Sequence, residues 1–249
     1  MKISLITVTY NCARTLSDTF DSVRSQKCEE FEYIVIDGGS TDGTLDIIRQ
    51  NNDIITFWSS APDKGIYDAM NKGLEKATGE YVGFLHSDDM FFSEGTIKSI
   101  MQSVEKDKPD VLYGDLEYVN SVSVDKVVRK WRSCDFEHKL LKKGWMPPHP
   151  TLYIRKDVIE EVGLFDTSFR IAADYDYILR LFSREDLKFA YLPEVIVKMR
   201  LGGASNKSIS NIIRKSKEDI RALKKNRAGG VFSLLRKNIS KIPQFFRHD

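Results

Sequence analysis

The segment Tyr33-Ile-Val-Ile-Asp-Gly-Gly-Ser-Thr-Asp-Gly-Thr44 decides the fold class. Its first part is a short apolar run that ends at Asp37, which is the pattern of a buried strand. The glycines that follow turn the chain into a short helical pattern at 45–48. A buried strand that ends in a carboxylate and turns directly into a helix is typical of parallel sheets, whose ligands gather at the carboxyl ends of the strands.

The same alternation extends outward from this segment. A β-branched run at 3–10 and a helical pattern at 16–28 precede it, and a strand, a helix and a further strand are predicted at 54–58, 67–77 and 81–85. We therefore expect an α/β fold with a Rossmann-like, mostly parallel sheet flanked by helices. After Pro109 the pattern is less regular. There we predict a hairpin at 111–119 and 127–131, strands at 151–154 and 189–199, and helices at 156–162 and 174–182.

Composition is that of a folded protein with an unusual tail. The 249 residues are 41% hydrophobic and 30% charged, and the net charge is only +2. Residues 207–249, however, hold 12 Lys and Arg against 3 Asp and Glu, so a basic tail follows an acidic body at 1–206. The first apolar run is too short for a signal peptide or a membrane span, which favours a cytoplasmic protein. The 3 cysteines show no CxxC spacing, which argues against a disulfide framework and a zinc site.

The glycine-rich loop at 37–44 suits a ligand that approaches the backbone closely. It matches neither the GxGxxG fingerprint nor a phosphate loop, which counts against dehydrogenases and P-loop NTPases. A carboxylate at Asp37 can accept hydrogen bonds from a nucleobase or ribose. The alternative is a plain turn in which Ser40 or Asp42 caps the next helix.

Asp88 and Asp89 are adjacent carboxylates that directly follow the predicted strand at 81–85. Adjacent carboxylates repel each other unless a positive group lies beside them, and Mg²⁺ or Mn²⁺ commonly binds one or two carboxylates together with substrate phosphates. The pair thus indicates a divalent-metal site for a diphosphate substrate. A solvated turn is the alternative, and His86 is expected to pack beside the site.

Five segments in order, at 3–11, 33–44, 61–73, 79–92 and 170–181, resemble the motifs of glycosyltransferase family 2. This family comprises inverting nucleotide-sugar enzymes of GT-A fold, and the resemblance is to bacterial enzymes of surface polysaccharides such as O-antigen, capsule and exopolysaccharide. It implies a UDP-sugar donor and Mn²⁺ or Mg²⁺. It also implies a nucleotide-sugar-binding half at 1–115 and an acceptor-binding half at 116–206.

The resemblance implies a role for individual residues. On the donor side, Val8 and Tyr10 match positions that contact the nucleobase, and Asp37 matches the carboxylate that accepts the uracil N3–H. Asp63 and Lys64 fall in the segment that lies along the nucleotide. Asp88 is assigned to the ribose, Asp89 to the metal and Arg200 to the diphosphate. Ser-Asp-Asp at 87–89 replaces a literal Asp-x-Asp, which implies fewer protein ligands for the metal. Trp145 and His149, in a proline-rich loop, suit a sugar acceptor. Tyr10 as a core aromatic, Lys64 as a plain loop lysine and His149 as a structural histidine stay open as alternatives.

An inverting transfer also needs a base that takes the proton of the acceptor hydroxyl. Asp174 and Asp176 are the candidates, and Asp176 has Arg180 four residues on, the spacing of a helix-surface ion pair. We therefore assign the base to Asp174. The resemblance agrees, although the glutamate that precedes this aspartate in the family is Ala173 here. The alternative for Asp174 is a simple N-cap.

Apolar residues recur at helical spacing in the last part of the tail, with basic residues between them; they are Val231, Leu235, Ile239, Ile242 and Phe246. A basic amphipathic segment binds anionic membrane surfaces. We therefore expect a peripheral enzyme at the inner face of the membrane, with a polyprenyl-diphosphate-linked saccharide as acceptor. Packing of the tail on the body or on a second subunit is the alternative. A nucleic-acid-binding module and a sugar nucleotidyltransferase stay open as other functions, although the latter's glycine-rich loop after the first strand is absent.

Overall fold

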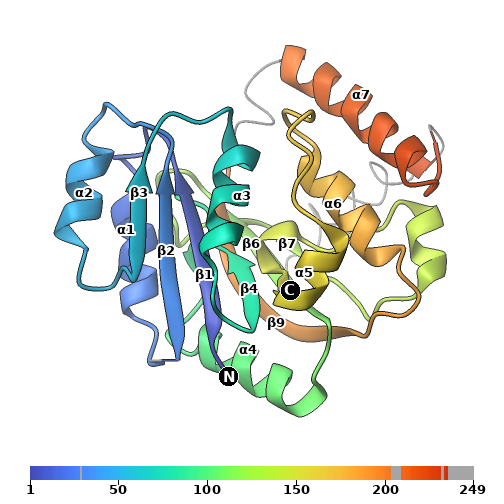
Figure 1. The fold of residues 1–249 in the computed structure, drawn as a ribbon, viewed down its shortest axis with the longest axis horizontal. Helices are drawn as coiled ribbons and strands as arrows, with labels where there is room; N and C mark the ends of the chain where they lie inside the picture. Colours follow the sequence, from blue (N-terminus) through green and yellow to red (C-terminus); the bar gives the residue numbers. More distant parts are fainter. Residues whose placement is uncertain (29, 203–208, 231–232, 235–249) are drawn as a thin grey trace.

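The computed structural model describes residues 1–28, 30–202, 209–230 and 233–234 (Figure 1). Within these residues one mixed sheet runs in the order β3-β2-β1-β4-β8-β6-β9-β5, and β7 pairs with β6. Helices flank this sheet, and the predicted α/β architecture is confirmed.

The first half of the sheet is parallel. It consists of β1 (Ile3–Thr9), β2 (Phe31–Asp37), β3 (Phe57–Ser60) and β4 (Tyr81–Phe84), joined by α1 (Leu16–Arg24), α2 (Thr44–Gln50) and α3 (Ile66–Lys76). All seven residues of β1 are buried, as expected for a parallel strand covered on both faces. The third strand begins at Phe57, later than the predicted 54–58, because residues 51–54 form turns.

The second half mixes parallel and antiparallel pairs. Its strands are β5 (Met90–Phe91), β6 (Val111–Val119), β7 (Val127–Trp131), β8 (Tyr153–Arg155) and β9 (Phe189–Arg200). The predicted hairpin is confirmed as β6 and β7, whereas β6 and β9 are parallel. Parallel pairing thus joins β1 to β4 and also β6 to β9, whereas β8 pairs antiparallel with β4 and β6, and β5 pairs antiparallel with β9.

The remaining helices are α4 (Thr96–Asp107), α5 (Lys156–Val162), α6 (Ala173–Phe182) and α7 (Ile209–Lys225), with 3₁₀ turns η1 (His138–Lys143) and η2 (His149–Thr151). The strand predicted at 151–154 begins only at Tyr153, because the proline-rich segment before it turns into η2. The sequence patterns did not predict β5, α4 or η1.

The described part of the basic tail is helical and lies on the body. Figure 1 shows α7 beside α6, and the two helices are in contact. Buried Leu234 belongs to the hydrophobic core. The amphipathic pattern from Val231 to Phe246 otherwise lies outside the described residues. In the part of the chain that the structure describes, no helix is both long and apolar enough to cross a membrane.

Candidate active site

The ends of β1, β2 and β4 bring three loops to one edge of the sheet. Thr9 pairs with Asp37 in the register of β1 and β2, and β4 lies on the other side of β1. The Asn11 amide donates a hydrogen bond to Ser40 Oγ (2.8 Å), and Thr15 Oγ1 donates one to the Ser87 carbonyl (2.9 Å). The chain turns from β1 toward β2 on one side and reaches β4 on the other, so this edge is the switch point at which α/β sheets bind ligands.

Asp37 organises the glycine-rich loop. It is 1% exposed and accepts five hydrogen bonds, from Thr9 Oγ1, Ser60 Oγ, the Gly39 amide, and the amide and hydroxyl of Ser40. Burial by itself raises its pKa, but these hydrogen bonds outweigh burial and lower it. Because protein donors already occupy the lone pairs of this carboxylate, no lone pair is left to accept a hydrogen bond from a nucleobase. This geometry argues against the expected contact between Asp37 and the uracil N3–H.

Tyr10 lies open at the same edge. Its side chain is 65% exposed, which contradicts the core alternative and leaves the ring free to stack on a base. Val8 is only 6% exposed and packs in the hydrophobic core, so the structure gives its side chain a role in the sheet.

Asp63 and Lys64 border a cleft of about 480 Å³ in front of α3. Tyr67, Phe169 and Arg170 also line this cleft. The Asp63 carboxylate is half-buried and Lys64 is exposed. The cleft therefore joins the expected nucleotide segment to Tyr67, which hydrogen-bonds to the proposed base.

Asp88 and Asp89 differ in environment. Asp88 is half-buried, whereas Asp89 is 0% exposed and accepts a hydrogen bond from the Arg200 amide on Oδ1 (3.2 Å). Its other oxygen, Oδ2, is buried and has no hydrogen-bond partner among the residues that the structure describes. Burial, and next the charge of Asp88, raise the pKa of Asp89 well above its usual value.

These carboxylates fit a divalent ion with few protein ligands. Among the described residues, no group of three or more His, Cys, Asp or Glu is arranged to hold a metal. The unpartnered, desolvated oxygen of Asp89 beside the charge of Asp88 is what a cation would stabilise, with the remaining ligands coming from a substrate diphosphate and water.

The guanidinium group of Arg200 is held by contacts with other residues of the protein. Arg200 is 7% exposed, and its guanidinium donates to the carbonyls of Asp88 (3.0 Å) and Ser121 (3.2 Å) and pairs with Asp18. The expected contact with the diphosphate is therefore not supported, because each guanidinium nitrogen already has a protein partner. Arg200 instead fastens the end of β9 to the loop that carries Asp88.

Trp145 is partly buried and packs against the hydrophobic core. Its ring packs against Phe136 (5.4 Å between centroids), Tyr113 (5.8 Å) and Phe182 (5.8 Å). The structure thus places Trp145 in an aromatic cluster, where it supports the proline-rich loop, and does not present it as a platform for an acceptor sugar.

Asp174 lies at the start of α6 with part of its side chain open. The side chain is 23% exposed. The single hydroxyl proton of Tyr67 is shared between Oδ1 (3.2 Å) and the Ile171 carbonyl (2.7 Å), and His149 Nδ1 lies 3.4 Å from Oδ2. It does not cap its own helix, since α6 has no side-chain cap bond of that kind. The amides of Arg170, Ile171 and Ala172, just before α6, instead donate to Glu218 of α7.

His149 connects Asp174 to the loop after β4. Its Nε2 lies 3.3 Å from His86 Nε2, and one of these two nitrogens must carry the proton. If Nδ1–H of His149 faces Asp174, then Nε2 of His149 accepts and His86 donates. Burial lowers the pKa of His86, while Asp88 and Asp174 oppose this shift. His149, expected at the acceptor, therefore contacts the proposed base.

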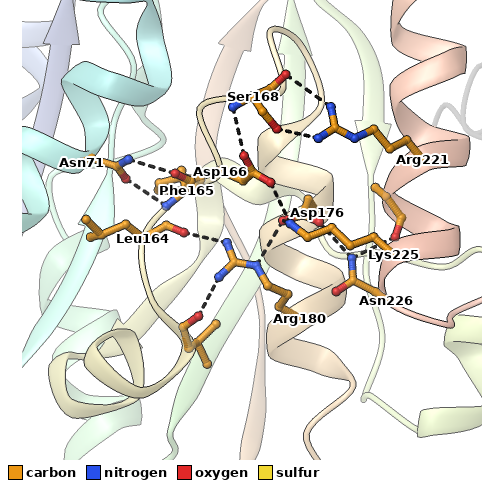
Figure 2. Close-up of polar contacts among 12 residues, drawn as sticks. Asn71, Leu164, Phe165, Asp166, Ser168, Asp176, Arg180, Arg221, Lys225 and Asn226 are labelled. Carbon is orange, nitrogen blue, oxygen red and sulfur yellow. Dashed lines mark hydrogen bonds and ion pairs between the residues drawn. The ribbon is translucent and has the colours of Figure 1, made fainter.

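Asp176 has the structural role expected from its spacing. It is 0% exposed, and Arg180, Lys225 and Asn226 hold its two oxygens at 2.9 to 3.1 Å (Figure 2). Sequence reasoning missed Tyr67, although it lies in the segment at 61–73, and Glu218, whose contact depends on the packing of α7.

This mixed α/β sheet, with carboxylates at its switch point, is the arrangement expected of a nucleotide-sugar transferase of GT-A fold. The chain belongs to glycosyltransferase family 2: the family profile, described as "Glycosyl transferase family 2", matches residues 4–163. A PGL/p-HBAD biosynthesis glycosyltransferase of Mycobacterium bovis is 32% identical over 209 residues, which cover 82% of this chain and 78% of that protein. Membership of this family does not favour the two other functions considered from the sequence, a nucleic-acid-binding module and a sugar nucleotidyltransferase.

Solved structures share the fold. TarS of S. aureus (residues 1–349), crystallised with UDP-GlcNAc, has a TM-score of 0.68 and 19% identity over 91% of this chain and 65% of that chain. The mannosyltransferase PcManGT of Pyrobaculum calidifontis, in complex with GDP-Man and Mn²⁺, has a TM-score of 0.68 and 17% identity over 96% of this chain and 69% of that one.

Proposed function

We propose that this glycosyltransferase moves a sugar from a UDP-sugar to an acceptor hydroxyl with inversion, and that Asp174 is its base. The observation that carries this proposal is the placement of Asp174. Its side chain is partly exposed and does not cap α6. It contacts His149, which in turn contacts His86 in the loop that carries Asp88 and Asp89.

The chemistry follows from this geometry. The acceptor oxygen attacks the anomeric carbon from the face opposite the diphosphate, its proton passes to Asp174, and the bond from that carbon to the diphosphate oxygen breaks. Tyr67 and His149 contact different oxygens of Asp174, so they fix the direction in which it accepts the proton. Inversion is the outcome of a single displacement.

UDP is the proposed nucleotide because the similar TarS chain was crystallised with UDP and with UDP-GlcNAc. The GDP-Man complex of PcManGT makes GDP the alternative to test. Tyr10 would stack on the base, and Lys64 beside the cleft would offset phosphate charge.

Asp89 would hold Mn²⁺ or Mg²⁺, with Asp88 beside it nearer the ribose, and the ion would offset the charge of the leaving diphosphate. The unpartnered oxygen of Asp89 supports this assignment, and so does the Mn²⁺ of PcManGT. The nucleotide-sugar half would comprise 1–115 and the acceptor half 116–206, which supplies His149 and Asp174.

The proposed acceptor is a lipid-linked saccharide, specifically one carried on polyprenyl diphosphate, and the basic tail would hold the enzyme on the inner face of an anionic membrane. The excess of 12 basic over 3 acidic residues at 207–249 supports this placement.

Calorimetric titration with UDP and with GDP, each with and without Mn²⁺, tests the donor assignment. We expect UDP to bind more tightly when Mn²⁺ is present and Asp89→Asn to remove this enhancement. A chain that binds neither UDP nor a UDP-sugar under either condition contradicts the proposed function. Asp125→Asn, on an exposed loop, is the control.

A further inference from the structure

The side chains of Asp63 and Tyr10 meet over the backbone of Gly38 at the sheet edge. A Cβ atom on Gly38 would collide with Oδ2 of Asp63 and lie 3.4 Å from Cδ2 of Tyr10. The absence of a side chain at Gly38 is therefore what lets the Asp63 carboxylate approach the backbone beside the open Tyr10 ring.

Among the described residues, a hydrogen bond holds the Asp63 carboxylate at one of its two oxygens. Its Oδ1 accepts a hydrogen bond from the Gly65 amide (2.7 Å), which fixes the turn before α3. Its Oδ2 lies over Gly38, and Asp63 is half-buried, so this oxygen can accept a further hydrogen bond from a ligand stacked on Tyr10.

Asp37 cannot serve in this place. It is 1% exposed, and five protein donors occupy its oxygens. Gly38, the next residue, has no side chain to offer. Of the carboxylates at 37 and 63, that of Asp63 has the oxygen that lies over Gly38 beside Tyr10.

We propose that Asp63, and not Asp37, is the carboxylate that accepts the N–H of the donor's nucleobase and so selects its identity. This inference rests on the proposed UDP-sugar donor. Uracil presents an N3–H donor between two carbonyls, whereas cytosine presents an N3 acceptor beside an amino donor. A carboxylate favours the N3–H, and an amide in its place can donate to a cytosine N3.

The test is calorimetric titration of the full chain, with Mn²⁺, using UDP, N3-methyl-UDP and CDP. N3-methyl-UDP keeps the ring for stacking but lacks the N–H. For the wild type we expect UDP to bind about tenfold to a hundredfold more tightly than N3-methyl-UDP, the range of one hydrogen bond to a charged group.

Asp63→Asn is the decisive variant, because its amide oxygen can still accept from the Gly65 amide and so preserves the turn. We expect it to bind UDP and N3-methyl-UDP within about threefold of each other and to gain affinity for CDP relative to UDP. Asp68→Asn is the matched control: Asp68 lines the same cleft but bonds to the Lys64 amide and to Lys72.

The role of Asp63 and the proposed UDP-sugar donor can fail separately in this experiment. A wild type that binds UDP and N3-methyl-UDP equally, or an Asp63→Asn variant that keeps the wild-type preference, overturns the role of Asp63 and leaves the UDP-sugar proposal intact. A folded wild type that binds no uridine nucleotide overturns both.

Discussion

Two aspartates of α6, separated by one residue, have different roles because the surroundings of each differ. Asp174 is partly exposed between Tyr67 and His149, whereas Asp176 is buried among Arg180, Lys225 and Asn226. A buried carboxylate held by two cations and an amide stabilises structure and has no free lone pair for an incoming proton.

Asp174→Asn should therefore lower transfer by about a hundredfold to ten-thousandfold, the usual contribution of a general base. UDP affinity, measured by calorimetry, should stay within about twofold, since Asp174 is placed at the acceptor side. Asp176→Asn is the contrast: it should lower the free energy of unfolding by about 3 kcal/mol. Near-normal transfer by Asp174→Asn would remove Asp174 from the mechanism.

Glu32, which lies away from the candidate active site, makes a pH-dependent contribution to the stability of the fold. It is 4% exposed and accepts hydrogen bonds from Lys2 Nζ (2.7 Å), Ser4 Oγ (2.5 Å) and Thr78 Oγ1 (2.6 Å). Burial alone raises its pKa, but these hydrogen bonds outweigh burial and lower the pKa from 4.5 to about 2.

Because the folded pKa is the lower one, this stabilisation is present above pH 4.5 and is lost as the pH falls toward about 2. The shift corresponds to at most about 3 kcal/mol. In urea titrations between pH 6 and pH 3, Glu32→Gln should show less loss of stability than the wild type. Asp125→Asn, on an exposed loop, should follow the wild type; parallel curves for all three proteins would refute the role of Glu32.

At the scale of elements, α7 contacts the segment that carries Asp174, the proposed base. Figure 2 shows Lys225 and Arg221 of α7 reaching Asp166 and Ser168 in the loop before α6, while Asn71 of α3 holds the backbone of Phe165. Glu218 adds a negative charge at the N-terminal end of α6, where helix amides lack partners. The basic tail therefore begins as a structural part of the active site.

Glu218→Gln should lower the free energy of unfolding by about 1 kcal/mol, since it removes the charge that complements the α6 terminus. Transfer should fall as well, because the first turn of α6 positions Asp174, whereas UDP affinity should not change. Glu160→Gln, on the exposed face of α5, is the control for loss of one charge. If Glu218→Gln matches this control in stability and transfer, α7 does not position the base.

At the scale of the molecule, the residues proposed for the donor come from the parallel half of the sheet, and those proposed for the acceptor come from the mixed half. Tyr10, Asp63 and Asp88 come from the first half, and His149 and Asp174 from the second. The two halves meet where β4 pairs with β8, so a ligand that spans the site contacts both.

The end of the tail should act separately from this body. Deletion of 235–249 removes the amphipathic pattern but keeps Leu234, which is buried. We expect the deletion to weaken co-sedimentation with vesicles of anionic lipid, most clearly at low salt, and to leave UDP binding intact. Vesicles of neutral lipid are the control, and unchanged sedimentation would exclude membrane binding by this segment.

The sequence by itself determined the order of strands and helices in the first half, the loops at their carboxyl ends and the family. These signals are local, because the side-chain period and the turn residues of one segment predict its structure without its neighbours. Choosing Asp174 over Asp176 was also possible, since the Asp176–Arg180 spacing lies within one helix.

Only the tertiary structure decided which polar groups are free to act. Asp37 and Arg200 have residue types suited to ligands, yet contacts from Ser60 to Asp37 and from Asp18 to Arg200 occupy them. Trp145 packs in a cluster with Phe182, and Glu218 reaches the start of α6 from a later helix. Each of these contacts joins distant parts of the chain, so no local pattern records it; whether a side chain is satisfied depends on what folding places beside it.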